Sequence, residues 1–143
     1  GEIVVAVRDK AATMPSPEHW IDGFKYDDTK VIDGRRINRF DLDEAAPDNP
    51  VRVSHRGGHI AWYNSKALQM AGVTRETPDP QGGRFEHDSN GELTGLVEER
   101  ANGAFNGVGV REETTRDDQR RGVELTTELM TAAGLTSVHD AST

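Results

Sequence analysis

Cysteine is absent from the 143 residues, and this excludes disulfide bonds, thiolate metal ligands and a cysteine nucleophile. Long apolar runs are missing too, since none approaches the roughly 20 residues that a bilayer-spanning helix needs. No signal peptide is recognisable in the first residues. From these absences we expect a cytoplasmic protein without a membrane contact.

Basic residues are outnumbered, with 17 lysines and arginines against 25 aspartates and glutamates and a formal net charge of -8. They are also scattered, whereas a nucleic-acid surface needs a basic patch, so we expect no nucleic-acid partner. Hydrophobic residues make up only 34% of the chain. That share is low for a self-contained enzyme and favours a piece that packs against something larger.

The first fifty residues predict short alternating elements. Residues 2–13 carry apolar positions at helical spacing, although the β-branched run at residues 3–5 is also compatible with a strand. Residues 20–28 alternate unevenly, as a short strand does. Residues 39–50 indicate a brief helix that is stopped by its two prolines.

The second half predicts a hairpin and one long helix. Residues 82–97 form a hairpin whose turn lies at Asn90-Gly91, a strong short-range turn signal. The longest helix should run from about Glu113 to Ala133, capped by Thr114 or Thr115. Residues 135–143 then begin a strand.

The segment HRGGH, residues 55–59, raises the question of a metal site. Histidines four residues apart share one face of a helix, but Gly57 and Gly58 each cost a helix roughly 1 kcal/mol relative to alanine. On one continuous strand the two histidines would be roughly 13 Å apart, too far for a shared ion. The remaining option is a hairpin that turns at Gly57-Gly58.

That hairpin pairs Val53 with Trp62 and separates apolar from polar residues. Its two histidines point to opposite faces, so they do not form a two-histidine metal site. His55 is then interpreted as a packed, hydrogen-bonded histidine, whereas His59 is either plain surface or functional. The apolar face holds Val51, Val53, His55, Ile60 and Trp62, and the polar face holds Arg52, Ser54, Arg56, His59, Ala61 and Tyr63.

Other polar residues have simple structural explanations. Asn64 or Ser65 caps a short helix. Glu98 and Glu99 are ambiguous, because they are also compatible with the first turn of a helix. The sequence contains no nucleophile elbow, phosphate loop, Ser-His-Asp spacing or complete metal set. Composition and spacing therefore support only an α+β domain.

Four blocks of sequence together resemble the YtcJ-like branch of the metal-dependent amidohydrolases (amidohydrolase family 3), which includes N-substituted formamide deformylases. The blocks are LDEAAPDNPV, HRGGHIAWYNSKALQMAGVT, TPDPQGGRFEHDSNGELTGLVEE and AAGLTSVHDA. One block alone would be weak evidence, but the four occur in order, at similar spacing, over nearly the whole chain.

The resemblance implies a (β/α)8-barrel hydrolase with one or two divalent metals, usually zinc, which activate a water for attack on an amide or related carbonyl carbon. The family's His-X-His ligand pair does not occur in this sequence. We therefore expect an excised insertion-region fragment, with the metal ligands upstream of Gly1 and downstream of Thr143. Such a fragment would bind no cofactor and be inactive alone, with the remainder of the barrel and a small amide-type substrate as partners.

The family pattern also implies roles for individual residues. His59 matches the histidine after glycine in the family's GH…N-S block and is implied to be catalytic and to contact substrate. Glu99 matches the acid of the TG-x-x-x-E pattern and is implied to be catalytic, although Arg100 departs from the smaller residues common beside it. The other implied substrate-binding residues are Asn64, His139 and Asp140, the last two at the end of barrel strand two.

We therefore expect an α+β, roll-like insertion domain in which antiparallel hairpins pack on the long helix. Residues 1–14 would be the incoming barrel-side helix, residues 15–112 the insertion, and residues 113–143 the outgoing helix with the start of barrel strand two. In the parent protein this domain would cover the barrel mouth and shape substrate specificity. Two alternatives stay open: a free-standing α+β binding or interaction domain, and a dimerisation element without catalysis.

Overall fold

The structure is a computed structural model that describes residues 1–31 and 34–139. The chain divides into two compact units, residues 1–111 and residues 112–143. The expected division of a single domain into an incoming helix, an insertion and an outgoing helix stays a prediction, and so does its assignment to a barrel.

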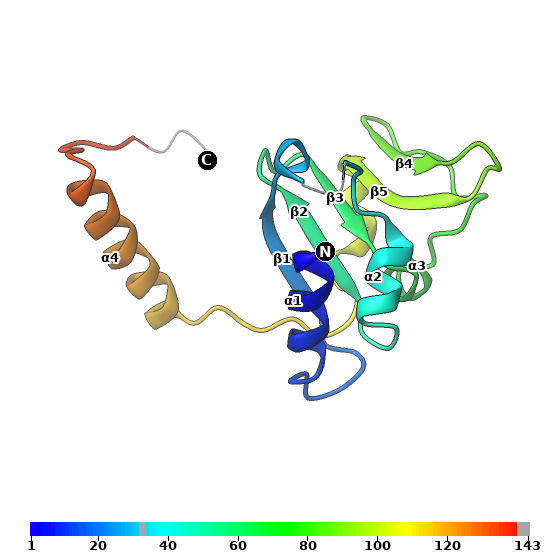
Figure 1. Cartoon of the computed structure of the whole chain (residues 1–143), viewed down its shortest axis with the longest axis horizontal. Coiled ribbons are helices and arrows are strands. Elements are labelled where there is room, and N and C mark those ends of the chain that lie inside the picture. The colour runs from blue at the N-terminus through cyan, green and yellow to red at the C-terminus, as the bar shows by residue number, and fades with distance from the viewer. Residues whose placement is uncertain (32–33, 140–143) are drawn as a thin grey trace. The chain divides into compact units, whose positions relative to one another are not determined.

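The first unit contains five strands and several short helices (Figure 1). The predicted helix near the start, the strand in residues 20–28 and the short helix in residues 39–50 are all confirmed. In chain order the elements are α1 (Glu2–Ala11), β1 (Ile21–Tyr26), η1 (Asp28–Lys30), α2 (Arg39–Ala45), β2 (Val51–His55), β3 (Ile60–Tyr63), α3 (Ser65–Met70), β4 (Gly83–His87), β5 (Leu93–Glu99) and η2 (Arg100–Phe105).

The five strands form one mixed sheet in the order β1-β2-β3-β5-β4. The three pairs among β2, β3, β5 and β4 are antiparallel, but β1 runs parallel to β2. The expectation of antiparallel hairpins alone is therefore wrong for the first strand. Between β1 and β2 the chain crosses over through η1 and α2, and parallel neighbours require a long connection of this kind.

The β2–β3 hairpin has the predicted register, with Val53 opposite Trp62. The predicted two-residue turn at Gly57-Gly58 is wrong, because β2 ends at His55 and β3 begins at Ile60, so that residues 56–59 connect them.

The strands on either side of the hairpin explain this wider connection. The Arg56 N–H donates a 2.9 Å hydrogen bond to the Tyr26 carbonyl of β1. On the other side, the His59 carbonyl accepts a 2.8 Å hydrogen bond from the N–H of Glu99, the last residue of β5. The backbone groups that a two-residue turn would pair with each other are thus bonded to neighbouring strands.

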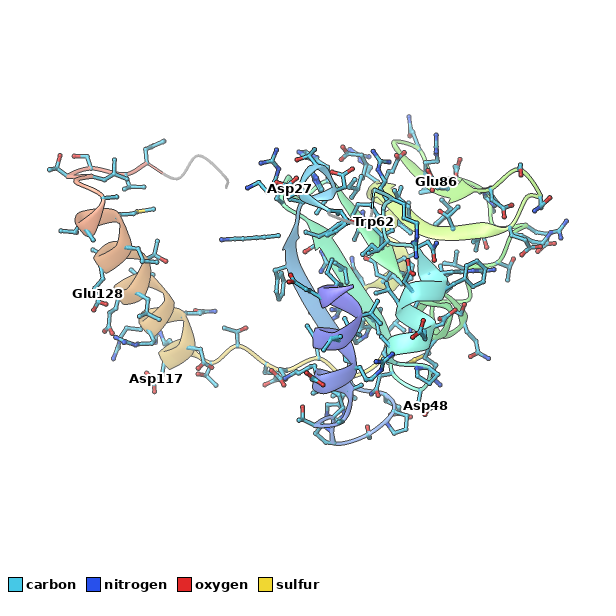
Figure 2. The ribbon with its side chains drawn as sticks, in the orientation of Figure 1. Asp27, Asp48, Trp62, Glu86, Asp117 and Glu128 are labelled. Carbon is cyan, nitrogen blue, oxygen red and sulfur yellow. The ribbon has the colours of Figure 1, made fainter. Side chains whose placement is uncertain are left out.

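Both faces of the sheet are buried. The predicted apolar face is confirmed, since it packs against α1 and α2 and includes Trp62, which Figure 2 shows within the sheet. The predicted polar face is wrong for Ala61 and Tyr63, which are only 1% exposed. Helices α3 and η2 pack on that second face. The alternation of apolar and polar residues within one hairpin does not reveal that other segments cover it. Its other buried members include Trp20, Phe85, Val97 and Phe105.

The predicted β4–β5 hairpin is confirmed, but its connection spans residues 88–92 and its tight turn is centred on Ser89 and Asn90, one residue before the predicted pair. The Gly91 N–H donates a 3.0 Å hydrogen bond to the Asp88 carbonyl, and Gly91 has a φ of +79°, which glycine adopts without strain. Glu98 and Glu99 end β5 and do not open a helix, because η2 begins only at Arg100.

The second unit contains α4 (Arg116–Ala132). Its predicted cap is confirmed: the Thr115 hydroxyl accepts from the Asp118 N–H at 3.1 Å, and the Asp118 carboxylate accepts from the Thr115 N–H at 2.9 Å. Residues 135–139 form no strand, and the rest of the strand predicted at 135–143 lies outside the described residues. The packing of the hairpins on this helix stays a prediction. Among residues 1–31 and 34–139, no helix has the length and apolar character to cross a membrane.

Candidate functional site

His59 and Glu99 meet at one end of the sheet. His59 immediately precedes β3 and Glu99 ends β5, and the antiparallel pairing of Ile60 with Glu98 brings these two ends together. The His59 Nδ1 atom lies 3.1 Å from Glu99 Oε1 and 3.2 Å from Oε2. Their side chains are 73% and 57% exposed. The two residues predicted to be catalytic, 40 positions apart in the sequence, thus form one solvent-accessible pair.

The chemistry of the pair follows from the carboxylate. Ionised carboxylate oxygens only accept hydrogen bonds, so the Nδ1 atom of His59 must be the donor. In the neutral imidazole this leaves the lone pair on Nε2. Within the described part of the chain, Nε2 has no hydrogen-bond partner. The pair therefore presents a proton or hydrogen-bond acceptor to the solvent.

The backbone at Glu99 is strained. Its φ of +50° and ψ of -125° lie in a region that residues other than glycine seldom occupy. Such a conformation costs about 1–3 kcal/mol and persists only where the surroundings enforce it, commonly at functional sites. At Glu99 this conformation turns the chain from β5 into η2.

Two buried or half-buried side chains support the pair from the sheet side. The Tyr63 hydroxyl donates a 2.9 Å hydrogen bond to Asn102 Oδ1, and Asn102 Nδ2 donates a 3.0 Å hydrogen bond to the Glu99 carbonyl. Burial raises the pKa of Tyr63 to about 12, so its phenol keeps the proton at neutral pH. The Tyr63 ring also stacks on Phe105, with 3.7 Å between centroids.

Sequence reasoning did not single out these supporting residues. The hairpin register placed Tyr63 on the same face as His59, and that was the available signal. No feature of the sequence pointed to Asn102, because its side chain reaches Glu99 and Tyr63 only through the turn into η2.

Asn64, predicted to contact substrate, is fully buried. Its Oδ1 accepts from the N–H groups of Val51 and Ala67, and its Nδ2 donates to the carbonyls of Ala46 and Asn49. All four hydrogen-bonding positions of the amide are therefore occupied. The geometry supports a structural role for Asn64: it caps α3 and ties this helix to the start of β2.

The two predicted residues near the C-terminus belong to the second unit. His139 is exposed, and Asp140 lies outside the described residues. Their substrate-binding role stays a prediction.

His55 is hydrogen-bonded, as predicted. Its Nδ1 accepts the Gly57 N–H at 3.1 Å, and its Nε2 lies 3.3 Å from Asp28 Oδ1. Both ring nitrogens therefore have protein partners on the face opposite to that of His59.

The described residues contain no group of three or more histidines, aspartates or glutamates that could hold a metal ion. His59 and Glu99 supply two potential ligands, whereas a catalytic zinc ion usually has three from the protein. The residues present therefore do not fit a catalytic metal centre by themselves.

A cavity of about 700 Å³ lies elsewhere in the first unit, between α1 and β1. Its floor is apolar, with Val7, Ile21 and Val53 among its lining residues, and neither His59 nor Glu99 lines it. Of its acidic residues, Asp41 already pairs with Arg35 at 2.6 Å. The chemistry therefore favours the His59–Glu99 pair as the candidate site.

Comparison with known proteins agrees with the sequence resemblance. The model of the amidohydrolase family matches residues 1–143. The chain is 32% identical to an N-substituted formamide deformylase of Arthrobacter pascens over 143 residues, which is 98% of this chain and 26% of that protein. It is 35% identical to the putative amidohydrolase YtcJ of Bacillus subtilis (strain 168) over 99 residues, which is 69% of this chain and 18% of that protein.

A solved structure, that of an uncharacterized metal-dependent hydrolase from Pyrococcus furiosus, resembles the chain with a TM-score of 0.49 and 24% identity. The match covers 94% of this chain and 25% of that one. The chain thus spans about a quarter or less of the length of these proteins.

Proposed function

Because this chain belongs to the amidohydrolase family, we propose that it works as part of a longer metal-dependent hydrolase that cleaves amide or related C–N bonds. The relative from Arthrobacter pascens, an N-substituted formamide deformylase, supports this reaction class. N-substituted formamides are therefore the first substrates to test.

In this proposal the chain forms the insertion that covers the mouth of a catalytic barrel, and it is inactive alone. Because the described residues hold no complete ligand set, the proposal assigns the metal ligands to other parts of the longer protein. A divalent metal held by residues outside this chain would supply the activated water. The sheet and its exposed pair would then shape the space in which a substrate is oriented.

The observation that carries the proposal is the exposed pair of His59 Nδ1 and Glu99 at 3.1 Å. Glu99 orients the imidazole and leaves its Nε2 free to accept a proton from the attacking water, as a carboxylate does for the base of a catalytic triad, and to pass that proton to the leaving amine. Once protonated, the same nitrogen donates to an oxyanion that develops on the attacked carbonyl. His59 is thus the proposed catalytic residue and Glu99 its positioning partner.

The test uses the longer protein with an N-substituted formamide as substrate. We expect His59→Ala to lower kcat/KM by about 10²-fold or more, the usual contribution of an acid–base group or oxyanion donor. Glu99→Gln should cause a smaller loss, because the amide oxygen still accepts from Nδ1 but carries no charge.

The matched control is His87→Ala, which removes another exposed histidine, one whose Nε2 contacts a backbone carbonyl at 3.2 Å. This variant should keep kcat/KM within about twofold of the parent. Equal activities of the His59→Ala and His87→Ala variants would refute the role of His59.

A further inference from the structure

We propose that Asn102 is a positioning residue that, together with Tyr63, keeps the Glu99 carboxylate beside the His59 imidazole. The inference rests on the proposed function for its catalytic meaning. The inference itself concerns only the geometry of the pair, which can be tested without an activity assay.

Hydrogen-bond partners on both sides fix the orientation of the Asn102 amide. The Glu99 carbonyl can only accept, so the atom 3.0 Å from it must be the amide nitrogen. The amide oxygen therefore faces the Tyr63 hydroxyl at 2.9 Å. Since the phenol keeps its proton, it donates, and both ends of the amide are fixed by partners of opposite polarity.

The Asn102 amide is attached to the backbone of a strained residue. It bonds to the carbonyl of Glu99, whose φ of +50° must be enforced by its surroundings. The N–H of the same residue bonds to the His59 carbonyl at 2.8 Å. Both backbone polar groups of Glu99 are thus held, and this fixes the point from which its side chain reaches His59.

Asn102 contacts both members of the His59–Glu99 pair. Asn102 Nδ2 also lies 3.5 Å from the His59 carbonyl, at the outer limit of a hydrogen bond. The same side chain therefore contacts the backbone of each member of the pair. Tyr63 anchors it to the buried core, because its ring stacks on Phe105 and is 1% exposed.

The consequence is a measurable bias in the His59 tautomer. While Glu99 is held beside Nδ1, neutral His59 carries its proton on Nδ1; if the carboxylate moves away, the balance shifts toward the Nε2–H tautomer. Nitrogen NMR of the imidazole in the 143-residue chain distinguishes them. A residue with a merely structural role would change stability without changing this ratio.

We expect Asn102→Ala to lower the ratio of the Nδ1–H to the Nε2–H form about two- to fivefold, the range expected when one exposed hydrogen bond is weakened. The matched control is Asn106→Ala, which truncates an exposed asparagine at the end of the same η2 segment and should leave the ratio unchanged. A ratio in the Asn102→Ala variant equal to that of the control would overturn the proposal.

If the Asn102→Ala chain does not fold, Tyr63→Phe decides the question, because it keeps the stacked ring and removes only the hydroxyl. It should lower the ratio about twofold, and an unchanged ratio would equally overturn the proposal. A failure of the proposed function would be recognised separately, as unchanged kcat/KM in the His59→Ala variant of the longer protein.

Discussion

Asn64→Ala tests whether this buried asparagine serves the fold or the substrate. The substitution removes an amide whose four hydrogen bonds join α3, β2 and the segment between α2 and β2. If the role is structural, the loss is one of folding stability. If Asn64 mainly contacted substrate, stability would hardly change.

The magnitude follows from the groups left behind. The N–H groups of Val51 and Ala67 lose their acceptor in a site that is 0% exposed. Each buried donor without a partner costs about 1–3 kcal/mol, so the free energy of unfolding should fall by about 2–6 kcal/mol. This is a large part of the 5–15 kcal/mol that is typical of a domain.

Urea unfolding followed by tryptophan fluorescence measures this loss. Trp62 and Trp20 are both nearly fully buried, and they lie in the cores on opposite faces of the sheet, so the signal reports on both. With a slope of about 2 kcal/mol per molar urea, the middle of the typical range, the midpoint should fall by about 1–3 M. The control Asn106→Ala, at an exposed position, should change stability by less than about 0.5 kcal/mol.

The result that refutes the reasoning is a midpoint for Asn64→Ala that equals the midpoint of the control. In that case the four hydrogen bonds would make no net contribution to the free energy of unfolding. A direct role in binding, seen as a raised KM in the longer protein, would then replace the structural explanation.

Two further perturbations test the backbone and the charges. Gly95→Ala should lower the free energy of unfolding by about 2–5 kcal/mol, because φ is +91° and the new Cβ would lie 2.7 Å from Arg39 Cβ. Gly91→Ala, with φ of +79° and nothing within 4 Å, should cost only about 1–2 kcal/mol, and equal urea midpoints would contradict this. Hydrogen bonds from Arg35 hold the pKa of Asp41 below its ordinary 3.8, so the stability they add is present above that pH and is lost as the pH falls through the lower folded value. The difference in urea midpoint between the parent and Asp41→Asn should therefore shrink below pH 3.8, and a pH-independent difference would contradict the assignment.

The local sequence pattern predicted the structure correctly where residues close together in the sequence decide it. The capping of α4 by Thr115 depends on residues within one turn of each other. The pairing of Val53 with Trp62 follows from the period of two along a hairpin, since a shift by one residue would move apolar side chains to the other face.

The same reasoning failed where the partner is distant. The second face of the sheet was expected to be polar, but residues 65–105 return to cover Ala61 and Tyr63. The width of the 56–59 connection likewise depends on β1 and β5, which take its outer hydrogen bonds. Neither neighbour can be inferred from the hairpin alone.

By itself, the sequence determined the register of the β2–β3 hairpin and the helix caps, because these depend on residue type and short spacing. The family, and with it His59 and Glu99 as candidates, followed from the resemblance of four blocks spread over nearly the whole chain. Only the tertiary structure decided that His59 and Glu99 touch, that Asn102 and Tyr63 support them and that Asn64 is saturated by backbone partners. The physical reason is that hydrogen-bond saturation and side-chain contact depend on distances between strands and helices that are tens of residues apart. Those distances are set by the packing of both faces of the sheet.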